Sequence, residues 1–553
     1  MKKTINILFA AIALAGCSIE ESTDTFESRE SLYQTEVQCK VAVNSCYIPL
    51  NGIFSYKLFE MTEDCTDIFY CNLAQEDNML EISPAQPGHG QVVWTNAYRG
   101  VMFCNEVIEC LNRYSPLDDA VKGRFAAEAR VLRALYYYYL TNIFNGVPFY
   151  TQMVETMDDL EAIRALPRTD ANDIRQFLYD DLKTNALPYF TKENGLKARV
   201  CEVPGHRAGY ALALMLMAKF AMWYEDWDAA LEPLLELEKL YGDLTEAHYP
   251  LSDLPWGVKN TPEGIFELQH EYSETGIRYY SSLAHAVKPN PQGEGVFDGI
   301  FYPELGMSVT GNTSAVATTH LGIFRPATGT SATESTSTAH TSSLFRPLPL
   351  TFDEYDDDLD RYTVKIDTAA VKSLTIRGAK IDRRALLVFG MGNIETGETF
   401  NQVKKYGHPW AGPKMWCYNM KSLYDSNNHR LFRYADAVLM IAECYCMKGD
   451  LETASLYCNK TRIRAGVDPL GYASQNDLLE NIRDERAREL AGELHRKFDL
   501  VRWGIWYEIT QRFNENSTMK RNMRPYHRYY PIPDTQCALT HYVLTNDEYD
   551  NAN

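Results

Sequence analysis

The sequence predicts a mainly α fold of tetratricopeptide-like helix pairs, with a loop-rich insert that contains a few short strands. Three observations carry this prediction. Residues 210–240 match residues 434–464 at an offset of 224, apolar residues recur at helical spacing through both flanks, and residues 243–429 lose that periodicity. The 553 residues are 45% apolar, and their 54 basic and 74 acidic side chains give a formal charge of −20. This composition indicates a folded chain, and its negative charge disfavours nucleic acid as a partner.

The N-terminus has the pattern of an export signal. Two lysines precede an apolar stretch from Ile5 to Leu14, which is too short to stay in a bilayer as a spanning helix. It ends in Leu14-Ala15-Gly16-Cys17, which resembles the bacterial lipoprotein box. An ordinary secretory signal with a chance Cys is the alternative. We therefore expect removal of residues 1–16, a lipid on Cys17, and a chain anchored to a membrane.

The remaining cysteines do not form a recognisable scaffold. Of thirteen, none outside the N-terminal box forms a CxxC pair or has zinc spacing with histidine. Cys104, Cys444 and Cys458 occupy helical apolar positions, where Cys acts as a small buried hydrophobe. For an exported protein this predicts a reducing or anaerobic habitat. A bridge such as Cys65–Cys71 remains open.

Each matching copy has a helix, a short acidic turn and a second helix, with small residues where paired helices touch. Tyr210 corresponds to Tyr434, and Asp226 in the turn corresponds to Asp450. Because such a unit cannot bury its apolar face alone, more helices are expected. Apolar spacing predicts them at 94–112, 125–144 and 173–182.

The insert has a different character. Residues 310–341 are rich in Ser and Thr and are predicted to be a loop, whereas short apolar runs at 265–268 and 385–389 predict small strands. A loop-rich insert on a rigid helical scaffold is a common place for a binding site.

Residues 482–504 carry charges at helical spacing: Glu485, Glu489, Glu493, Arg496, Asp499 and Arg502. On one continuous helix these would form an ion-pair ladder along one side, worth about 0.3–0.5 kcal/mol per exposed pair. Three carboxylates on a helix also suggest acid–base chemistry or a metal site. The interleaved arginines would satisfy them, so we expect a structural role.

These features together resemble the SusD/RagB family of Bacteroidetes outer-membrane lipoproteins, over nearly the whole mature chain. Five motifs carry the resemblance: Trp94 with Tyr98 and Asn105; Glu128–Leu140 with Phe144–Pro148; Phe432–Leu439 with Ala442 and Glu443; Glu485–Trp503; and Tyr530–Pro533. An acidic run at Glu20, Glu21 and Asp24 also resembles the surface-export tag of such lipoproteins, or is a solvated tether. Two features depart from the family pattern. Leu494 stands where the family usually has Gly, and Thr545–Tyr549 only loosely matches the closing "QN…Y", which leaves the C-terminal packing open.

The resemblance implies a non-catalytic binding protein with about four helix pairs and no cofactor. Family members are lipid-anchored on the outer face of the outer membrane. They lie as a hinged lid on a SusC-type TonB-dependent transporter and pass oligosaccharides, less often peptides, to it. The expected layout is a signal peptide (1–16) and one SusD-like domain (17–553). That domain comprises a helical core (30–242 and 430–512), a ligand-binding insert (243–429) and a C-terminal segment (513–553).

Tyrosine is abundant, with 36 residues, and suits a sugar site because a sugar ring has an apolar face and a rim of hydroxyls. Aromatic and polar residues outside the helical periodicity form three clusters: Asp67, Phe69, Tyr70, Asn72, Gln75 and Trp94; Tyr272, Arg278, Tyr279, Tyr280, Phe301 and Tyr302; and Trp410, Trp416 and Tyr418. The family commonly builds its site from the loop ahead of the first repeat and from the insert, which favours the first two clusters. Replacing Trp94, or Tyr279 together with Tyr280, by Ala is expected to weaken binding with little change in melting temperature. Tyr136–Tyr139, inside a strong helix, are expected to be core.

Other interpretations remain open. A peptide-binding lid of the same transporter type would differ only in its ligand. A surface glycoside hydrolase would need two carboxylates about 5 to 9.5 Å apart, and so acidic a chain does not exclude that pair. No GxSxG, HExxH or P-loop motif occurs, however. Asp356–Asp358 with Asp360 could hold calcium, but they lack EF-hand spacing, so a solvated turn is the simpler interpretation.

Overall fold

The first long helix pair follows from the apolar spacing in the sequence. α6 (Gly90–Tyr114) and α7 (Asp119–Phe144) contain the predicted stretches 94–112 and 125–144, each extended toward its N-terminus. Tyr136–Tyr139 of α7 are at most 3% exposed, which confirms that they are core. The computed structural model describes residues 29–71, 76–254, 258–272, 278–279, 314–316, 350–356, 361–366, 375–376, 379–380, 384, 426–514 and 516–550.

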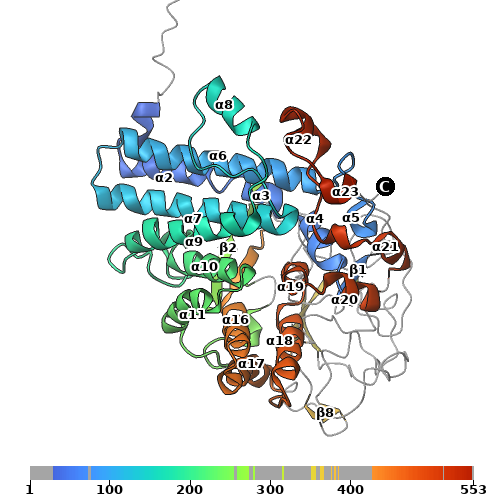
Figure 1. Cartoon of the computed structure of the whole chain (residues 1–553). Coiled ribbons are helices and arrows are strands. Elements are labelled where there is room, and N and C mark those ends of the chain that lie inside the picture. The colour runs from blue at the N-terminus through green and yellow to red at the C-terminus, as the bar shows by residue number, and fades with distance from the viewer. Residues whose placement is uncertain are drawn as a thin grey trace, which may run out of the picture.

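The helices stack in one continuous array (Figure 1). Below α6 and α7 follow α9 (Ala171–Asn185), α10 (Tyr210–Trp223), α11 (Trp227–Tyr241), α16 (Tyr434–Met447) and α17 (Leu451–Ala465). The two matching copies are therefore helix pairs, as predicted, and α9 packs between α7 and α10. The molecule has the mainly α, helical-repeat fold that the sequence predicts.

The acidic turn in each copy has a capping role. The Asp226 side chain accepts a hydrogen bond from the Ala229 backbone N–H at 2.9 Å, and Asp450 accepts one from that of Thr453 at 3.2 Å. An aspartate at this position satisfies a backbone donor that the helix cannot satisfy itself.

Smaller elements surround the stack. Before α6 come η2 (Arg29–Tyr33), α2 (Glu36–Ser45), α3 (Leu50–Ile53), α4 (Tyr56–Phe59), the π-helix η3 (Glu60–Asp64), β1 (Phe69–Cys71) and α5 (Glu76–Met79). Between α7 and the insert lie α8 (Met157–Arg164), η4 (Leu187–Tyr189) and η5 (Pro204–His206), and the insert begins with η6 (Leu251–Asp253). The C-terminal part adds α18 (Gln475–Leu490), α19 (Arg496–Arg502), α20 (Trp506–Phe513), α21 (Ser517–Asn522), η10 (Pro525–Arg528), α22 (Asp534–Leu539) and α23 (Asp547–Asp550).

The charged stretch 482–504 is two helices and not one. α18 ends at Leu490 and α19 begins at Arg496. Between them, Gly492 has φ +77° and Leu494 has φ +66°, so the backbone turns through the left-handed region. Leu494 thus keeps the conformation that glycine adopts most easily, which explains why the resemblance points to Gly there. The expectation of one continuous ladder was wrong.

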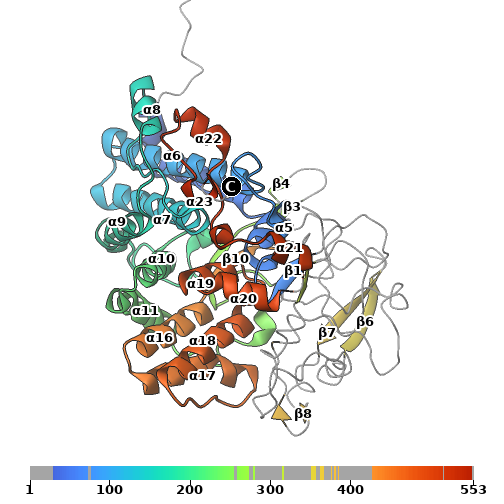
Figure 2. The same cartoon turned by 45° about the vertical axis from the view of Figure 1, so that its right-hand side comes forward.

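Short antiparallel strand pairs connect the insert to the helices. β2 (Gly264–Leu268), which contains the predicted strand 265–268, pairs with β10 (His429–Arg433), and β10 leads directly into α16. β5 (Ser314–Val316) pairs with β1, so one part of the stretch 310–341 is a strand and not a loop. The remaining pairs are β3 (Glu271–Tyr272) with β4 (Arg278–Tyr279), β6 (Leu350–Asp356) with β7 (Arg361–Ile366), and β8 (Thr375–Ile376) with β9 (Ala379–Lys380). Figure 2 shows β6, β7 and β8 on the side away from α9–α11. The strand expected at 385–389 lies outside the described residues.

The closing motif is structurally in place although its sequence match is loose. The Asn546 side chain accepts a hydrogen bond from the Ile532 N–H at 2.7 Å and donates one to the Ile532 carbonyl at 2.9 Å. The Tyr549 hydroxyl donates to the Tyr529 carbonyl at 2.7 Å. These bonds fix the segment Tyr530–Pro533 against the C-terminus.

Cysteine chemistry is simple in the part of the chain that the structure describes. Cys104, Cys444 and Cys458 are buried free thiols, as predicted. Cys65 is also free and donates to the Met61 carbonyl, so it does not form the bridge to Cys71 that the sequence left open. Among the described helices, none has the length and apolar character to cross a membrane. The predicted signal and Cys17 lie outside the described residues.

Candidate functional site

Three residues of the first candidate cluster lie in the protein interior. Trp94 is 4% exposed, and its ring packs edge-on against Phe144 with centroids 5.1 Å apart. Phe69 is fully buried in the same core. Asp67 is also fully buried and binds the Arg496 guanidinium through two hydrogen bonds of 2.9 and 2.6 Å.

The ligand-binding assignment of these three residues is therefore corrected, because none presents a surface to a ligand. Truncating a buried Trp costs about 3–5 kcal/mol, so replacing Trp94 by Ala should lower the melting temperature and not leave it unchanged. The sequence could not separate the two roles, since Trp94 lies near a helix start where both are common.

Strand register places four other candidates. Tyr70 of β1 lies opposite Ala315 of β5. In the β3–β4 pair, Tyr272 lies opposite Arg278, and Tyr279 lies opposite Glu271. Residues directly opposite each other share one face of an antiparallel pair, and neighbouring residues alternate between faces.

Tyr272 and Arg278 therefore share one face of this hairpin, and Tyr279 is on the other. An aromatic and a cationic residue are therefore directly opposite in the register, and residues of these two types suit a sugar ring and its hydroxyls.

The remaining candidates stay predictions. The residues that lie outside the described part of the chain are Asn72, Gln75, Tyr280, Phe301, Tyr302, Asp357, Asp358, Asp360, Trp410, Trp416 and Tyr418.

The acidic residues of α18 belong to a buried ion-pair network and not to an exposed ladder. Glu485 is fully buried and pairs with Arg384 at 2.5 Å and with Arg462 and Arg488 at 3.3 Å. Burial alone would raise the pKa of Glu485, but these three guanidinium groups outweigh it and lower the pKa to about 2. The carboxylate is thus held ionised and fully engaged, which gives it no capacity as a general acid.

Glu489 forms the second half of this network. It pairs with Arg433 at 2.5 Å, with Arg384 at 2.8 Å and with Arg464. Arg433 also binds Glu263 and Glu493, each at 2.8 Å. The structural role predicted for these acids is supported, but their main partners come from distant segments. Periodicity within one helix gives no signal for Arg384, Arg433 or Glu263.

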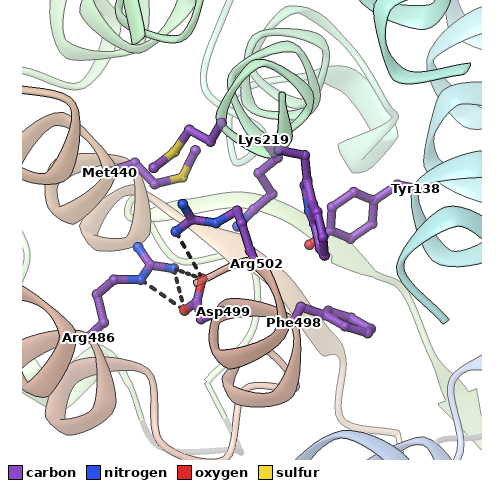
Figure 3. Close-up of a pocket in the computed structure, with 9 residues that line it drawn as sticks. Tyr138, Lys219, Met440, Arg486, Phe498, Asp499 and Arg502 are labelled. Atoms are coloured by element: carbon purple, nitrogen blue, oxygen red, sulfur yellow. Dashed lines mark hydrogen bonds and ion pairs between the residues drawn. The ribbon is translucent and has the colours of Figure 1, made fainter. Parts of the chain in front are cut away.

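A small cavity lies between α10, α16, α18 and α19 (Figure 3). Its volume is about 20 Å³, and it is lined by Tyr138, Lys219, Met222, Trp223, Met440, Arg486, Phe498, Asp499 and Arg502. Arg486 holds Asp499 at 2.8 Å. Burial alone would raise the pKa of Asp499, but Arg486 and Arg502 outweigh it and keep the pKa below its usual range. This volume fits about one water molecule, whereas sites for small ligands measure roughly 300–1,000 Å³, so it is not an oligosaccharide site.

In the portion of the chain that the structure describes, no three His, Cys, Asp or Glu side chains gather in a group that could hold a metal ion. Of the predicted acidic calcium candidates, only Asp356, at the end of β6, lies in that portion.

Two family models match the chain. Residues 403–549 match the SusD family, and residues 24–183 match a family described as starch-binding and associating with the outer membrane. A curated SusD-like protein of Formosa agariphila is 26% identical over 572 aligned positions, which cover 96% of this chain and 95% of that protein.

Solved structures of similar fold cover almost the whole chain. A SusD superfamily protein of Bacteroides vulgatus has a TM-score of 0.63 at 19% identity and covers 93% of this chain and 99% of its own. A SusD-like carbohydrate-binding protein of Bacteroides fragilis has a TM-score of 0.64 at 18% identity, with the same coverage. A laminarin-binding SusD-like protein has a TM-score of 0.55 at 18% identity, with the same coverage again.

The family models match the first and last parts of the chain, the relative aligns with nearly all of it, and the helical stack has the same fold as the solved structures. From end to end, the chain is thus similar to proteins of the SusD family.

Proposed function

We propose that this protein is a lipid-anchored surface protein of the outer membrane that binds oligosaccharides without cleaving them. It delivers them to a SusC-type TonB-dependent transporter. The observation that carries the proposal is the match of both ends of the chain to SusD-type family models, together with a fold shared with a SusD-like carbohydrate-binding protein and a laminarin-binding SusD-like protein.

The strand pairs beside the helical stack support this proposal. Tyr272 and Arg278 share one face of the β3–β4 hairpin, and β1 with Tyr70 pairs with an insert strand. We assign the ligand surface to the hairpin and the insert, with Tyr279, Tyr280, Tyr302, Asn72 and Trp416 as further candidates. The buried carboxylates of α18 and α19 are all engaged by arginines, which supports a binder and not a hydrolase.

A glycan and peptide array with the mature chain, residues 17–553, tests the function directly. We expect retention of one glycan class, with the bound glycan recovered at its original length. Retention of peptides alone would favour the peptide-binding alternative. Shorter glycan products would contradict the proposal and favour a glycoside hydrolase.

The two faces of the hairpin allow a matched pair of variants. Tyr272→Ala and Tyr279→Ala remove the same ring from neighbouring strands of one hairpin but from opposite faces. We expect one of them to weaken glycan binding about tenfold, as the loss of a stacking contact does, and the other to bind normally. If both single variants, and the double variant Tyr279→Ala with Tyr280→Ala, bind glycan as tightly as the wild type, the hairpin is not part of the ligand site.

Anchor and partner need their own measurements. Cys17→Ser should abolish labelling by a fatty-acid analogue and release the protein from the outer membrane. Co-purification of the tagged wild-type protein with a TonB-dependent barrel would support the delivery step, and its absence from intact membranes would contradict it.

A further inference from the structure

Arg384 is an insert residue buried within the helical core. It is 2% exposed, and its guanidinium Nη1 lies 2.5 Å from Glu485 and 2.8 Å from Glu489. Both carboxylates are on α18, one helical turn apart, and Arg384 lies 101 and 105 residues before them in the chain. A single side chain thus connects the last third of the insert to the helix that packs on the last repeat.

Both carboxylates that bind Arg384 also have other cationic partners. Glu485 also binds Arg462, Arg488 and the Thr461 hydroxyl. Glu489 also binds Arg433 and Arg464.

Four carboxylates (Glu263, Glu485, Glu489 and Glu493) face five guanidinium groups (Arg384, Arg433, Arg462, Arg464 and Arg488). Without Arg384, Glu485 keeps Arg462 and Arg488, and Glu489 keeps Arg433 and Arg464. Removing the Arg384 side chain therefore leaves both carboxylates of α18 paired within the helical core, and the contact that is lost is the one to the insert.

Arg384 contacts a different part of the helical core from the other described contacts of the insert. β2 and β10 join its two ends beside α16, and β5 joins β1 near the N-terminal region. Arg384 follows the β8–β9 pair by only a few residues and attaches to α18. Buried ion pairs are screened little by salt, and removing one partner of a buried pair is strongly destabilising.

We propose that Arg384 is a positioning residue that fixes the insert on the last helical repeat by binding Glu485 and Glu489 together. Its role in ligand binding rests on the proposed function, because the insert carries the ligand candidates. It does not itself contact the ligand, since its guanidinium is buried between the two carboxylates.

Hydrogen exchange of the full mature chain tests the attachment without a ligand. Arg384→Met should speed exchange in peptides covering residues 375–384 at least tenfold and leave peptides from α10 and α11 unchanged. Arg384→Lys, which keeps the charge but loses the planar fork, should recover part of the protection. The matched control is Arg488→Met, which removes another cation from Glu485 within α18 itself and should leave peptides 375–384 unchanged.

The proposal is overturned if Arg384→Met leaves these peptides unchanged, if Arg488→Met speeds them equally, or if Arg384→Lys gives no recovery. Binding to laminarin and to soluble starch, by affinity electrophoresis, forms a second measurement. We expect Arg384→Met to weaken whichever binding the wild type shows at least tenfold, and Arg488→Met to preserve it. Absence of binding by the wild type would count against the proposed function, whereas the exchange result would still decide the role of Arg384.

Discussion

The two copies of the helix pair, α10–α11 and α16–α17, share a geometry and differ in how they are held. In each copy a helix of 14 residues is followed by one of 15. α10 is buried from Tyr210 to Met222 with Lys219 as its one charge, whereas α16 carries the buried acids Asp436 and Glu443. The first copy packs against α7, α9 and β2, whereas the second also receives the C-terminal helix α18.

Equivalent positions show what this difference means. Lys219 and Glu443 occupy the same position of the repeat and carry opposite charges. Lys219 binds Asp436 of the other copy at 2.7 Å, and Glu443 binds Arg502 of α19 at 2.7 Å. Small residues and the aspartate cap thus determine the geometry of the helix pair, and the buried charges determine which other segments bind to it.

The largest effect is expected at Arg433, which has Gly209 as its equivalent in the first copy. Arg433 is fully buried and binds Glu263, Glu489 and Glu493. Arg433→Met leaves three carboxylates short of a cation and should lower the free energy of unfolding by about 3–5 kcal/mol, measured by urea denaturation. Arg164→Met, which breaks the partly exposed pair with Glu161, is the control and should change it by less than about 0.5 kcal/mol. Equal effects would contradict the view that charge holds the second copy.

Lys219→Met tests the contact between the copies. Burial alone would raise the pKa of Asp436, but Lys219 and Arg486 outweigh it and hold the pKa well below its usual range. Because Arg486 remains 2.9 Å from Asp436, we expect a loss of about 2–3 kcal/mol at pH 7, less than for Arg433.

The pH dependence of the Lys219→Met effect gives an internal check. A depressed carboxyl pKa stabilises the folded state above the unfolded-state value near 4 and loses that contribution below it. The loss caused by Lys219→Met should therefore shrink as pH falls below about 4. A loss of constant size would show that lost packing, and not the ion pair, is responsible.

The sequence predicts the shared helix geometry of the two copies, but it does not predict the charged contacts that distinguish them. Helices, caps and repeats were predictable because apolar spacing and Asp226 or Asp450 act within a few residues. The burial of Glu485 and Glu489 was not, since charges of alternating sign look like a solvated helix face. Their partner Arg384 lies more than 100 residues away, and Glu263, which shares Arg433 with Glu489, lies more than 200 residues away; nothing local marks either residue.

The candidate site shows the same limit. Trp94 and Phe69 have the composition of a binding surface, and only tertiary packing places them in the core. Tyr272 and Tyr279 looked equivalent in the sequence, and strand register separates them onto two faces. Leu494 is a local departure with a local explanation, since its φ of +66° is the glycine conformation held by a leucine.

A smaller effect is expected from His495, which lies against the second copy, stacked on Phe432. Burial, followed by repulsion from Lys219, lowers the pKa of His495 to about 4. The unfolded chain takes up a proton below its ordinary value near 6.5 and the folded one does not, so stability falls as pH falls from 6.5 toward 4.

Between pH 7 and pH 5 the wild type should therefore lose about 1–2 kcal/mol that His495→Gln does not lose, by urea denaturation at each pH. His248→Gln, at an exposed position, is the control and should keep the wild-type pH dependence. An unchanged profile for His495→Gln would place the acid sensitivity elsewhere.

The smallest effect tests what the two copies share. Asp226→Ala and Asp450→Ala each remove a side chain that accepts one backbone N–H at a helix start. Both positions are exposed, so each variant should lose about 1 kcal/mol, and the two losses should agree within about 0.5 kcal/mol. The double variant should show their sum, because the caps belong to separate helices and share no partner. A much larger loss in the second copy alone would mean that its cap also supports the charged network, and that geometry and charge are not independent in this repeat.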